Sequence, residues 1–143
     1  MDIVEHKKYA KDLFPPRLVQ MNAELVEKKE NLKLVLIYII TELQEHERAG
    51  NSGMGVTIKS IADGIVIDRN KRILQGDGTY RYQPVKDNLT RKTAEHLVEQ
   101  LGLMTLIYTM TIGTGKVIFL TPRGVQVLKY FNEQKTQQTQ TQS

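Results

Sequence analysis

The sequence contains no cysteine, which excludes a disulfide framework and any metal site built on thiolates. Its longest apolar run, residues 34–40, is far shorter than a membrane-spanning helix. The N-terminal stretch MDIVEHKKYAKD lacks the apolar core of a signal peptide. We therefore expect a cytoplasmic protein that does not contact a membrane.

The sequence also lacks the motifs of common catalytic sites, including His-Glu-x-x-His, Gly-x-Ser-x-Gly and the dinucleotide-binding fingerprint. Its three histidines, His6, His46 and His96, fall in unrelated segments. The carboxylates lie on polar helical stretches and predict no paired acid–base site. We therefore expect no enzymatic activity, no metal site and no cofactor.

Among the 143 residues, 40% are hydrophobic and 25% are charged, which is typical of one globular domain. The net charge of +4 arises in the second half of the chain. Residues 1–66 have nine Lys/Arg and ten Asp/Glu, residues 67–115 have seven and five, and residues 116–143 have four and one. A basic surface is typical of nucleic-acid-binding proteins, although a pI near 9.3 is also common in proteins that bind none.

The two ends of the chain differ in composition from its middle. Residues 1–30 form a polar extension that Pro15 and Pro16 interrupt. A short helix is predicted after them from four apolar residues at roughly helical spacing: Leu18, Met21, Leu25 and Val26. Residues 133–143, EQKTQQTQTQS, have almost no apolar residue and predict a disordered tail.

Residues 31–132 carry the patterns of a folded domain. Asn31 is a candidate N-cap for a helix that is apolar on two faces and is therefore predicted to be central and buried. After a Gly-rich break, Thr57 is the candidate cap of a short second helix. A small hairpin is then predicted around Gly76-Asp77-Gly78.

A third helix is predicted from Asn88 or Thr90 to about Leu101, with Gly102 as its C-cap. Its inner stripe has helical spacing and consists of Ala94, Leu97, Val98 and Leu101. A second hairpin follows around Gly113-Thr114-Gly115. A last helix then begins with Thr121 as N-cap, and its apolar face carries Val125, Val127, Leu128 and Phe131.

The stretch TRKTAEHLVEQLGLMTLIYTMTIGTGKVIFLTPRGVQVLKYF resembles the recognition-helix and wing half of winged helix-turn-helix regulators. It is similar to MarR-type repressors in a helix ending in LGLM, a following hairpin and an LTPRG step into a C-terminal helix. The same layout occurs in small plasmid-partition DNA binders of the TubR kind. The resemblance implies an α+β, mainly helical fold with a winged-helix core, a β-hairpin wing, and flanking N- and C-terminal helices.

One feature departs from a compact helix-turn-helix, in which a turn of about 3–4 residues joins the two helices. Here the first predicted hairpin, residues 66–87, separates the second helix from the third. This hairpin must therefore be an insertion that leaves the two helices packed against each other.

The third helix is the candidate recognition helix. At about 100° per residue, Lys92, His96 and Glu99 point away from its apolar stripe. The candidate DNA-binding residues of this helix are Asn88, Thr90, Arg91, Lys92, Glu95 and His96. The alternative is the solvated face of an ordinary surface helix, because Glu95 and Glu99 are unfavourable near phosphate.

Two further groups of residues are candidates for DNA contact. Thr114 and Lys116 lie at the tip of the predicted wing, where a Gly-rich turn suits close approach to phosphate. A denser basic cluster flanks the first hairpin and consists of Arg69, Lys71, Arg72 and Arg81. With Tyr80 and Tyr82 it predicts either a second DNA contact or a stacking surface of the RNA-binding kind, unless the tyrosines are packing residues.

We expect sequence-specific binding of double-stranded DNA by a homodimer, as in a transcriptional regulator associated with the nucleoid. The homodimer follows from the apolar faces of the first and last helices, which have no obvious partner within the chain. A dimer would place two recognition helices about 34 Å apart, one turn of DNA. The alternatives are a plasmid or viral partition or replication protein that coats repeated sites, and a winged-helix module that binds a protein partner.

Overall fold

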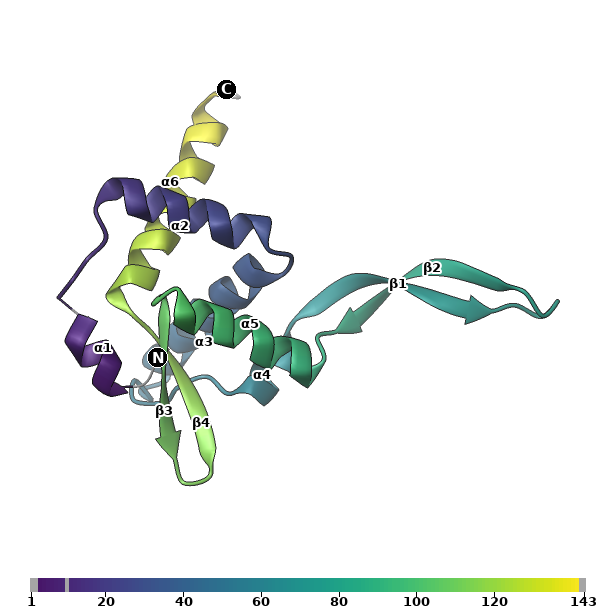
Figure 1. The fold of residues 1–143 in the computed structure, drawn as a ribbon, viewed down its shortest axis with the longest axis horizontal. Helices are drawn as coiled ribbons and strands as arrows, with labels where there is room; N and C mark the ends of the chain where they lie inside the picture. The colour runs from purple at the N-terminus through teal and green to yellow at the C-terminus, as the bar shows by residue number, and fades with distance from the viewer. Residues whose placement is uncertain (1–2, 10, 142–143) are drawn as a thin grey trace.

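The computed structural model describes residues 3–9 and 11–141, and its fold is α+β, mainly helical with two antiparallel hairpins (Figure 1). This agrees with the predicted class. Among these residues, no helix has both the length and the apolar composition needed to cross a membrane. In chain order the elements are α1 (Ile3–Tyr9), α2 (Pro16–Lys28), α3 (Leu32–Arg48), α4 (Ile58–Gly64), β1 (Val66–Leu74), β2 (Tyr80–Asn88), α5 (Arg91–Leu103), β3 (Ile107–Ile112), β4 (Gly115–Leu120) and α6 (Pro122–Thr141).

The hydrophobic core lies where helices α2 to α6 meet the base of the β3–β4 hairpin. Helix α3 packs on α5 and contributes Leu36 and Ile39, which are fully buried. The stripe predicted for α5 faces this core, because all four of its residues are buried: Ala94, Leu97, Val98 and Leu101. Burial of each large aliphatic side chain stabilises the fold by about 1.5–3 kcal/mol, so this stripe holds α5 in place and leaves its opposite face to solvent.

Helix α2 has two apolar faces, and the structure buries the one with the smaller side chains, namely Val19, Ala23 and Val26. Of the four apolar residues from which this helix was predicted, only Val26 is buried, and the others are 40–54% exposed: Leu18, Met21 and Leu25. The inner face of α2 packs against α6. The inner faces of these two helices therefore cover each other, whereas Leu18, Met21 and Leu25 leave an exposed apolar face on α2, and the homodimer stays a prediction.

Helix α3 begins after Asn31, as predicted, but this residue does not cap the helix through its side chain. Its φ of 67° lies in the left-handed region, which Asn tolerates, and the side chain makes no capping hydrogen bond. The second apolar face of α3 is not buried, since Leu34 and Ile37 are 48% and 40% exposed. The prediction of a helix buried on both faces is wrong, because the neighbouring helices and the hairpin base cover only one side of α3.

Three helices begin with the predicted threonine caps, each accepting the backbone N–H of the residue three positions later: Thr57, Thr90 and Thr121. Gly102 is not the C-cap of α5, because it is buried within the helix. The left-handed conformation falls instead on Thr105, whose φ is 64°. The chain therefore turns later than the glycine indicated.

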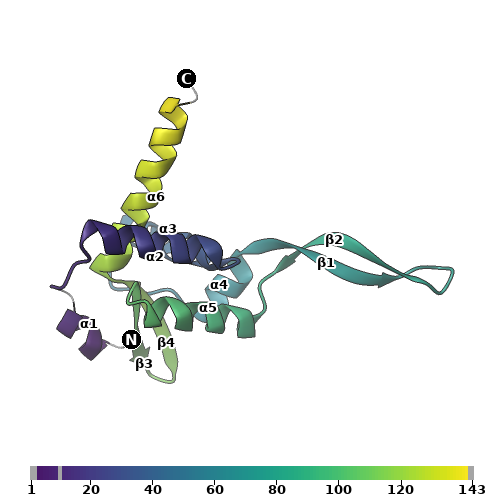
Figure 2. The same ribbon diagram turned by 45° about the horizontal axis from the view of Figure 1, so that its top comes forward.

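Strands β1 and β2 form a hairpin that projects from the body, and we call residues 66–88 the arm (Figures 1 and 2). Its paired residues run from Val66 and Asn88 at the base to Leu74 and Tyr80 at the tip. With nine residues in each strand, the arm is about 30 Å long. No residue of the arm falls in the buried class, so both faces of this ribbon meet solvent along its length.

Strands β3 and β4 pair from Ile107–Leu120 to Ile112–Gly115, as predicted for the second hairpin, and we call residues 107–120 the wing. Val56, in the connection between α3 and α4, forms an antiparallel bridge with Ile118 of β4. Two backbone hydrogen bonds of 3.0 and 2.8 Å make this bridge. The connection is thereby joined to the base of the wing.

Helix α6 continues to Thr141, and its C-terminal half stands away from the body (Figure 2). Residues 133–141 are therefore helical where the composition predicted disorder, and the last two residues of that segment lie outside the described residues. The difference has a physical basis: Gln, Glu and Lys are good helix formers, and a helix already nucleated by the packed half extends at low cost.

Candidate nucleic-acid interface

Helix α5 presents an open surface on the side opposite its buried stripe. Lys92, His96 and Glu99 are exposed there, as the spacing predicted, and so are Arg91 and Glu95. Thr90 caps the helix, and its first turn contains no acidic residue. The partial positive charge of the helix N-terminus therefore adds to the charges of Arg91 and Lys92 at the position where an anion would bind.

The charges on α5 partly cancel one another. The guanidinium Nε of Arg91 lies 3.5 Å from Oε1 of Glu95, one turn further on. Both side chains are more than half exposed, so this ion pair is weak and its arginine can exchange partners. Lys92 is thus the cation of α5 that is best placed to meet a phosphate, while Glu95 and Glu99 make a deep fit to an anionic surface less favourable.

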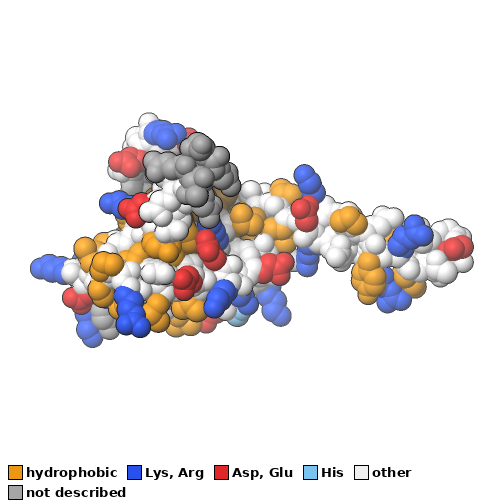
Figure 3. All heavy atoms as spheres, turned by 90° about the horizontal axis from the view of Figure 1, so that it is seen from above, with side chains coloured by type: hydrophobic (Ala, Val, Ile, Leu, Met, Phe, Trp, Pro, Cys, Tyr) orange, Lys and Arg blue, Asp and Glu red, His pale blue; other side chains and the backbone are white. Residues whose placement is uncertain are grey.

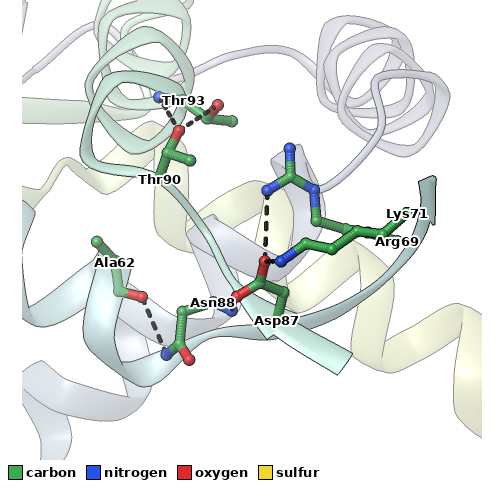
Figure 4. A network of polar contacts seen from close by, with 7 residues as sticks. All are labelled: Ala62, Arg69, Lys71, Asp87, Asn88, Thr90 and Thr93. Atoms are coloured by element: carbon green, nitrogen blue, oxygen red, sulfur yellow. Dashed lines mark hydrogen bonds and ion pairs between the residues drawn. The ribbon is translucent and has the colours of Figure 1, made fainter. Parts of the chain in front are cut away.

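Asn88 is not part of α5, the candidate recognition helix, contrary to the sequence analysis. It ends β2, and its side-chain Nδ2 donates hydrogen bonds of 3.3 Å to the backbone oxygen of Ala62 (Figure 4) and of 2.7 Å to that of Asp63, both near the end of α4. Thr90 likewise is occupied by its capping bond to Thr93. Both residues position α5 and are committed to contacts within the chain.

The arm is an insertion between two helices that stay packed, as the sequence analysis required. Its base is closed by a 3.3 Å hydrogen bond from the backbone N–H of Leu89 to the carbonyl oxygen of Ile65. Both of these side chains are buried, at 4% and 6% exposure, so the ends of the insertion are anchored in the core. Helices α4 and α5 pack directly against each other across this junction.

The wing carries its predicted residues at an exposed tip. Gly113 adopts a φ of 63° in the turn, and Thr114 and Lys116 are exposed beside it. At the wing base, a Cβ on Gly55 would come within 2.9 Å of the Cβ of Val117, so a glycine is needed where the connection crosses β4. The wing is therefore anchored at its base and free at its basic tip.

Helix α1 packs on the wing through an aromatic stack. The rings of His6 and Tyr108 lie 3.9 Å apart and nearly parallel, and Tyr108 in turn stacks on Phe119 of β4. Burial lowers the pKa of His6 and raises the pKa of the Tyr108 hydroxyl. Nothing in the sequence indicated this contact, because it joins segments about a hundred residues apart.

The predicted basic cluster is split between the two faces of the arm. The strand register places Arg69, Lys71 and Arg81 on one face and Arg72 on the other. Near the base, Lys71 and Arg69 lie 2.8 and 3.8 Å from the same carboxylate, Asp87 (Figure 4). The hydrogen bond from Lys71 is the largest of the effects that lower the pKa of Asp87. Asp87 was missed by the sequence analysis, because only the strand register brings it to these cations.

The opposite face of the arm is aromatic towards its tip. The guanidinium of Arg72 lies 3.8 Å from the centre of the Tyr80 ring, a cation–π contact. Tyr80 and Tyr82 are 55% and 72% exposed, and the neighbouring Leu74 is 60% exposed. The tyrosines are therefore not core residues, which removes the packing alternative.

The structure brings two of the three predicted groups to one side of the body. Helix α5 and the wing tip lie on the same side, away from α2 and the free end of α6 (Figures 1 and 2). The arm leaves the body at the N-terminal end of α5 and extends sideways. The wing and the first turn of α5 therefore form a single candidate interface, and the arm flanks it.

Comparisons with protein-family models, curated proteins and solved structures find no match to this chain. The function is accordingly inferred from the geometry and charges of the described residues.

Proposed function

We propose that the chain binds double-stranded DNA through the exposed face of α5 and the tip of the wing, in the manner of a winged helix-turn-helix protein. The observation that carries the proposal is the position of these two elements on one side of the body, with α4 packed behind α5. An α-helix fits the major groove, where the base pairs are distinguishable, while a hairpin beside it reaches the neighbouring backbone.

The order of the elements supports this proposal. Helices α3, α4 and α5 are followed by the wing and then by α6, which is the order that the resemblance implies. The bridge between Val56 and Ile118 holds the wing base against the helices. With α5 anchored by its buried stripe, the helix and the wing form a preorganised surface, so little ordering is needed on binding.

The charges assign different roles to the residues of this surface. Arg91 and Lys92 lie in the first turn of α5, where base and phosphate contacts are made in helix-turn-helix proteins. Lys116 at the wing tip is suited to a phosphate contact, which positions the protein and does not read sequence. His96 lies further along the exposed face and can donate to either kind of acceptor.

The test is fluorescence anisotropy with a labelled duplex at two salt concentrations. We expect binding that weakens steeply with salt, because phosphate contacts release counterions. Arg91→Ala with Lys92→Ala should weaken binding to a preferred site by about 1–3 kcal/mol if either residue reads a guanine. Lys116→Ala should weaken binding to all duplexes alike and lower the salt slope by about one unit.

A control variant with the same loss of charge is available on the opposite side of the body. Lys28 and Lys29 are exposed at the end of α2, and changing both to alanine should leave DNA affinity nearly unchanged. An equal loss of affinity in this control would mean that net charge alone drives binding. Absence of binding at low salt would refute the proposal.

A second candidate function follows from the cancelled charges of α5. Because Arg91 pairs with Glu95 and Glu99 lies nearby on the exposed face, this face is close to neutral and suits a protein partner. Such a role predicts that duplex DNA is not bound at low salt and that variants of α5 affect only a protein complex.

A further inference from the structure

We infer that the outer half of the arm is a second DNA-binding element, which contacts the same duplex beyond the segment that α5 and the wing cover. This inference rests on the proposed function and extends it to a longer binding site. It starts from the geometry of the junction, because β2 ends at Asn88 and α5 begins at Arg91. The base of the arm is thus adjacent to the helix terminus at which DNA would bind.

The junction holds the arm in a defined direction relative to α5. The Leu89–Ile65 hydrogen bond closes its base, and the amide of Asn88 bonds to the end of α4. The arm is about 30 Å long, close to the rise of about 34 Å for one turn of DNA. The arm is therefore long enough to contact the part of a duplex that extends beyond α5. A two-stranded ribbon also has the dimensions to enter a major groove.

The charges of the arm point to a polyanion. The arm contains five Lys/Arg and three Asp. Two of the cations, Arg69 and Lys71, share Asp87 near the base. In the part of the chain that the structure describes, no carboxylate lies within ion-pair distance of Arg72 or Arg81, so these two outer arginines are available to phosphates.

The uncharged side chains of the outer arm suit a groove. Leu74, Tyr80 and Tyr82 share a face with Arg72, and each is more than half exposed. Figure 3 shows hydrophobic and basic side chains together on the outer part of the arm. The cation–π contact with Tyr80 restrains the Arg72 guanidinium, whose N–H groups can donate to phosphate or base acceptors.

A two-stranded ribbon exposed on both faces is only marginally stable by itself. Clamping at its base and the Arg72–Tyr80 stack keep the arm extended without contacts to the body along its outer half. Burial of its apolar face against sugars and base edges would add the stabilisation that the isolated ribbon lacks. The positive charge favours DNA as the partner over an ordinary protein surface.

The experiment compares duplexes of about one and about three helical turns by anisotropy, using the full chain and two arm variants. In the first variant, residues 70–84 are replaced by Asn-Gly, which retains the Arg69–Val85 pair and closes it with a two-residue turn. In the second, Arg72→Ala and Arg81→Ala leave the ribbon at full length. Lys28→Ala with Lys29→Ala is the charge-matched control.

We expect both arm variants to lose affinity for the long duplex by about tenfold, with a salt slope lower by about two units for the double arginine variant. Their affinity for the short duplex should stay within about twofold of the full chain, since this duplex meets only α5 and the wing. The longer duplex offers more binding positions to every variant. The long-to-short affinity ratio of each variant is therefore compared with that of the full chain, in which this statistical advantage is the same.

Three outcomes would overturn the inference. An unchanged long-to-short ratio in both variants would show that the arm does not touch the duplex. The same titrations are repeated with single-stranded DNA. If the arm variants lose more affinity for the single strand than for the duplex, the arm is a base-stacking surface instead. If the full chain binds neither duplex, the proposed function fails and the inference fails with it, whereas failure of the arm alone leaves short-duplex binding intact.

Discussion

The side-chain amide of Asn88 donates a 2.7 Å hydrogen bond to the backbone carbonyl oxygen of Asp63, which ties the end of the arm to α4. This bond satisfies an otherwise free carbonyl at the helix C-terminus. It also explains how α4 and α5 stay packed although the whole arm separates them in sequence. A polar residue predicted to contact DNA thus has a structural role in placing α5, the candidate recognition helix.

The first prediction concerns this bond. Asn88→Ala should lower the free energy of unfolding by about 1 kcal/mol, the usual net value of a hydrogen bond. Asn88→Asp should cost more, because a carboxylate cannot donate to these carbonyls and adds negative charge at a helix C-terminus. Urea denaturation measures both, with Asn70→Ala on the exposed arm as the control. An Asn88→Asp variant as stable as the parent would show that the contact contributes nothing.

The second prediction concerns Gly124, in the first turn of α6. A Cβ at this position would overlap the backbone oxygen of Leu106 and lie 2.7 Å from Cδ1 of Leu120. Because backbone cannot move aside cheaply, Gly124→Ala should destabilise the fold by about 3 kcal/mol. Gly53→Ala is the matched control, since its Cβ would enter open space. Thermal unfolding compares the two, and equal melting temperatures would contradict the packing described here.

The third prediction is a pH dependence that arises from His6. Burial against Tyr108 lowers the pKa of His6 from 6.5, and its Nδ1 is buried with no hydrogen-bond partner among the described residues. As pH falls below 6.5, the unfolded chain takes up a proton before the folded chain does, so the contribution of His6 to stability falls. It is fully present above this pH.

Urea denaturation at several pH values between about 5 and 8 measures this effect. His6→Phe keeps an aromatic ring on Tyr108 but does not titrate, so the variant should lose part of the parent's pH dependence in this range. If parent and variant have the same pH profile, protonation of His6 does not weaken the packing of α1 on the wing.

The fourth prediction concerns the Arg91–Glu95 ion pair. Glu95→Gln removes a negative charge from the exposed face of α5 and releases Arg91. If this face meets DNA, affinity for random-sequence duplex should rise by about fivefold, the value of roughly one charge interaction in water. Glu133→Gln removes the same charge on α6, away from the interface, and should have little effect. A fall in affinity with Glu95→Gln would instead indicate that Glu95 accepts a hydrogen bond from a base.

Local chemistry explains which predictions from the sequence were confirmed. Apolar spacing placed the buried stripe of α5, and threonines marked three helix starts, because periodicity and capping act within a few residues. Both hairpins were predicted, since glycine-rich turns between β-forming runs are local features as well. Gly102 was misplaced as a cap because the glycine packs inside the helix, where burial outweighs its conformational preference.

Less of the candidate site than of the fold could be predicted from the sequence. The exposed residues of α5 and the wing tip followed from helical spacing and from the turn. The contacts that Asn88, Arg69 and Lys71 make within the chain could not be predicted, because they depend on strand register and on helix packing. The bridge between Val56 and Ile118 gave no signal either, since a single residue carries no periodicity.

The sequence by itself determined the places of both hairpins, of helices α2 to α5 and of the start of α6, which face of α5 is buried, and that the net positive charge arises in the second half of the chain. Only the tertiary structure decided which apolar face of α2 is buried, because both faces are apolar and the choice depends on the fit to α6. It also decided that the arm stands clear of the body, and that Arg69 and Lys71 share Asp87 near its base while Arg72 and Arg81 lie towards its tip. These outcomes depend on residues far apart in the chain, whose contacts are set by packing and register and not by local preference.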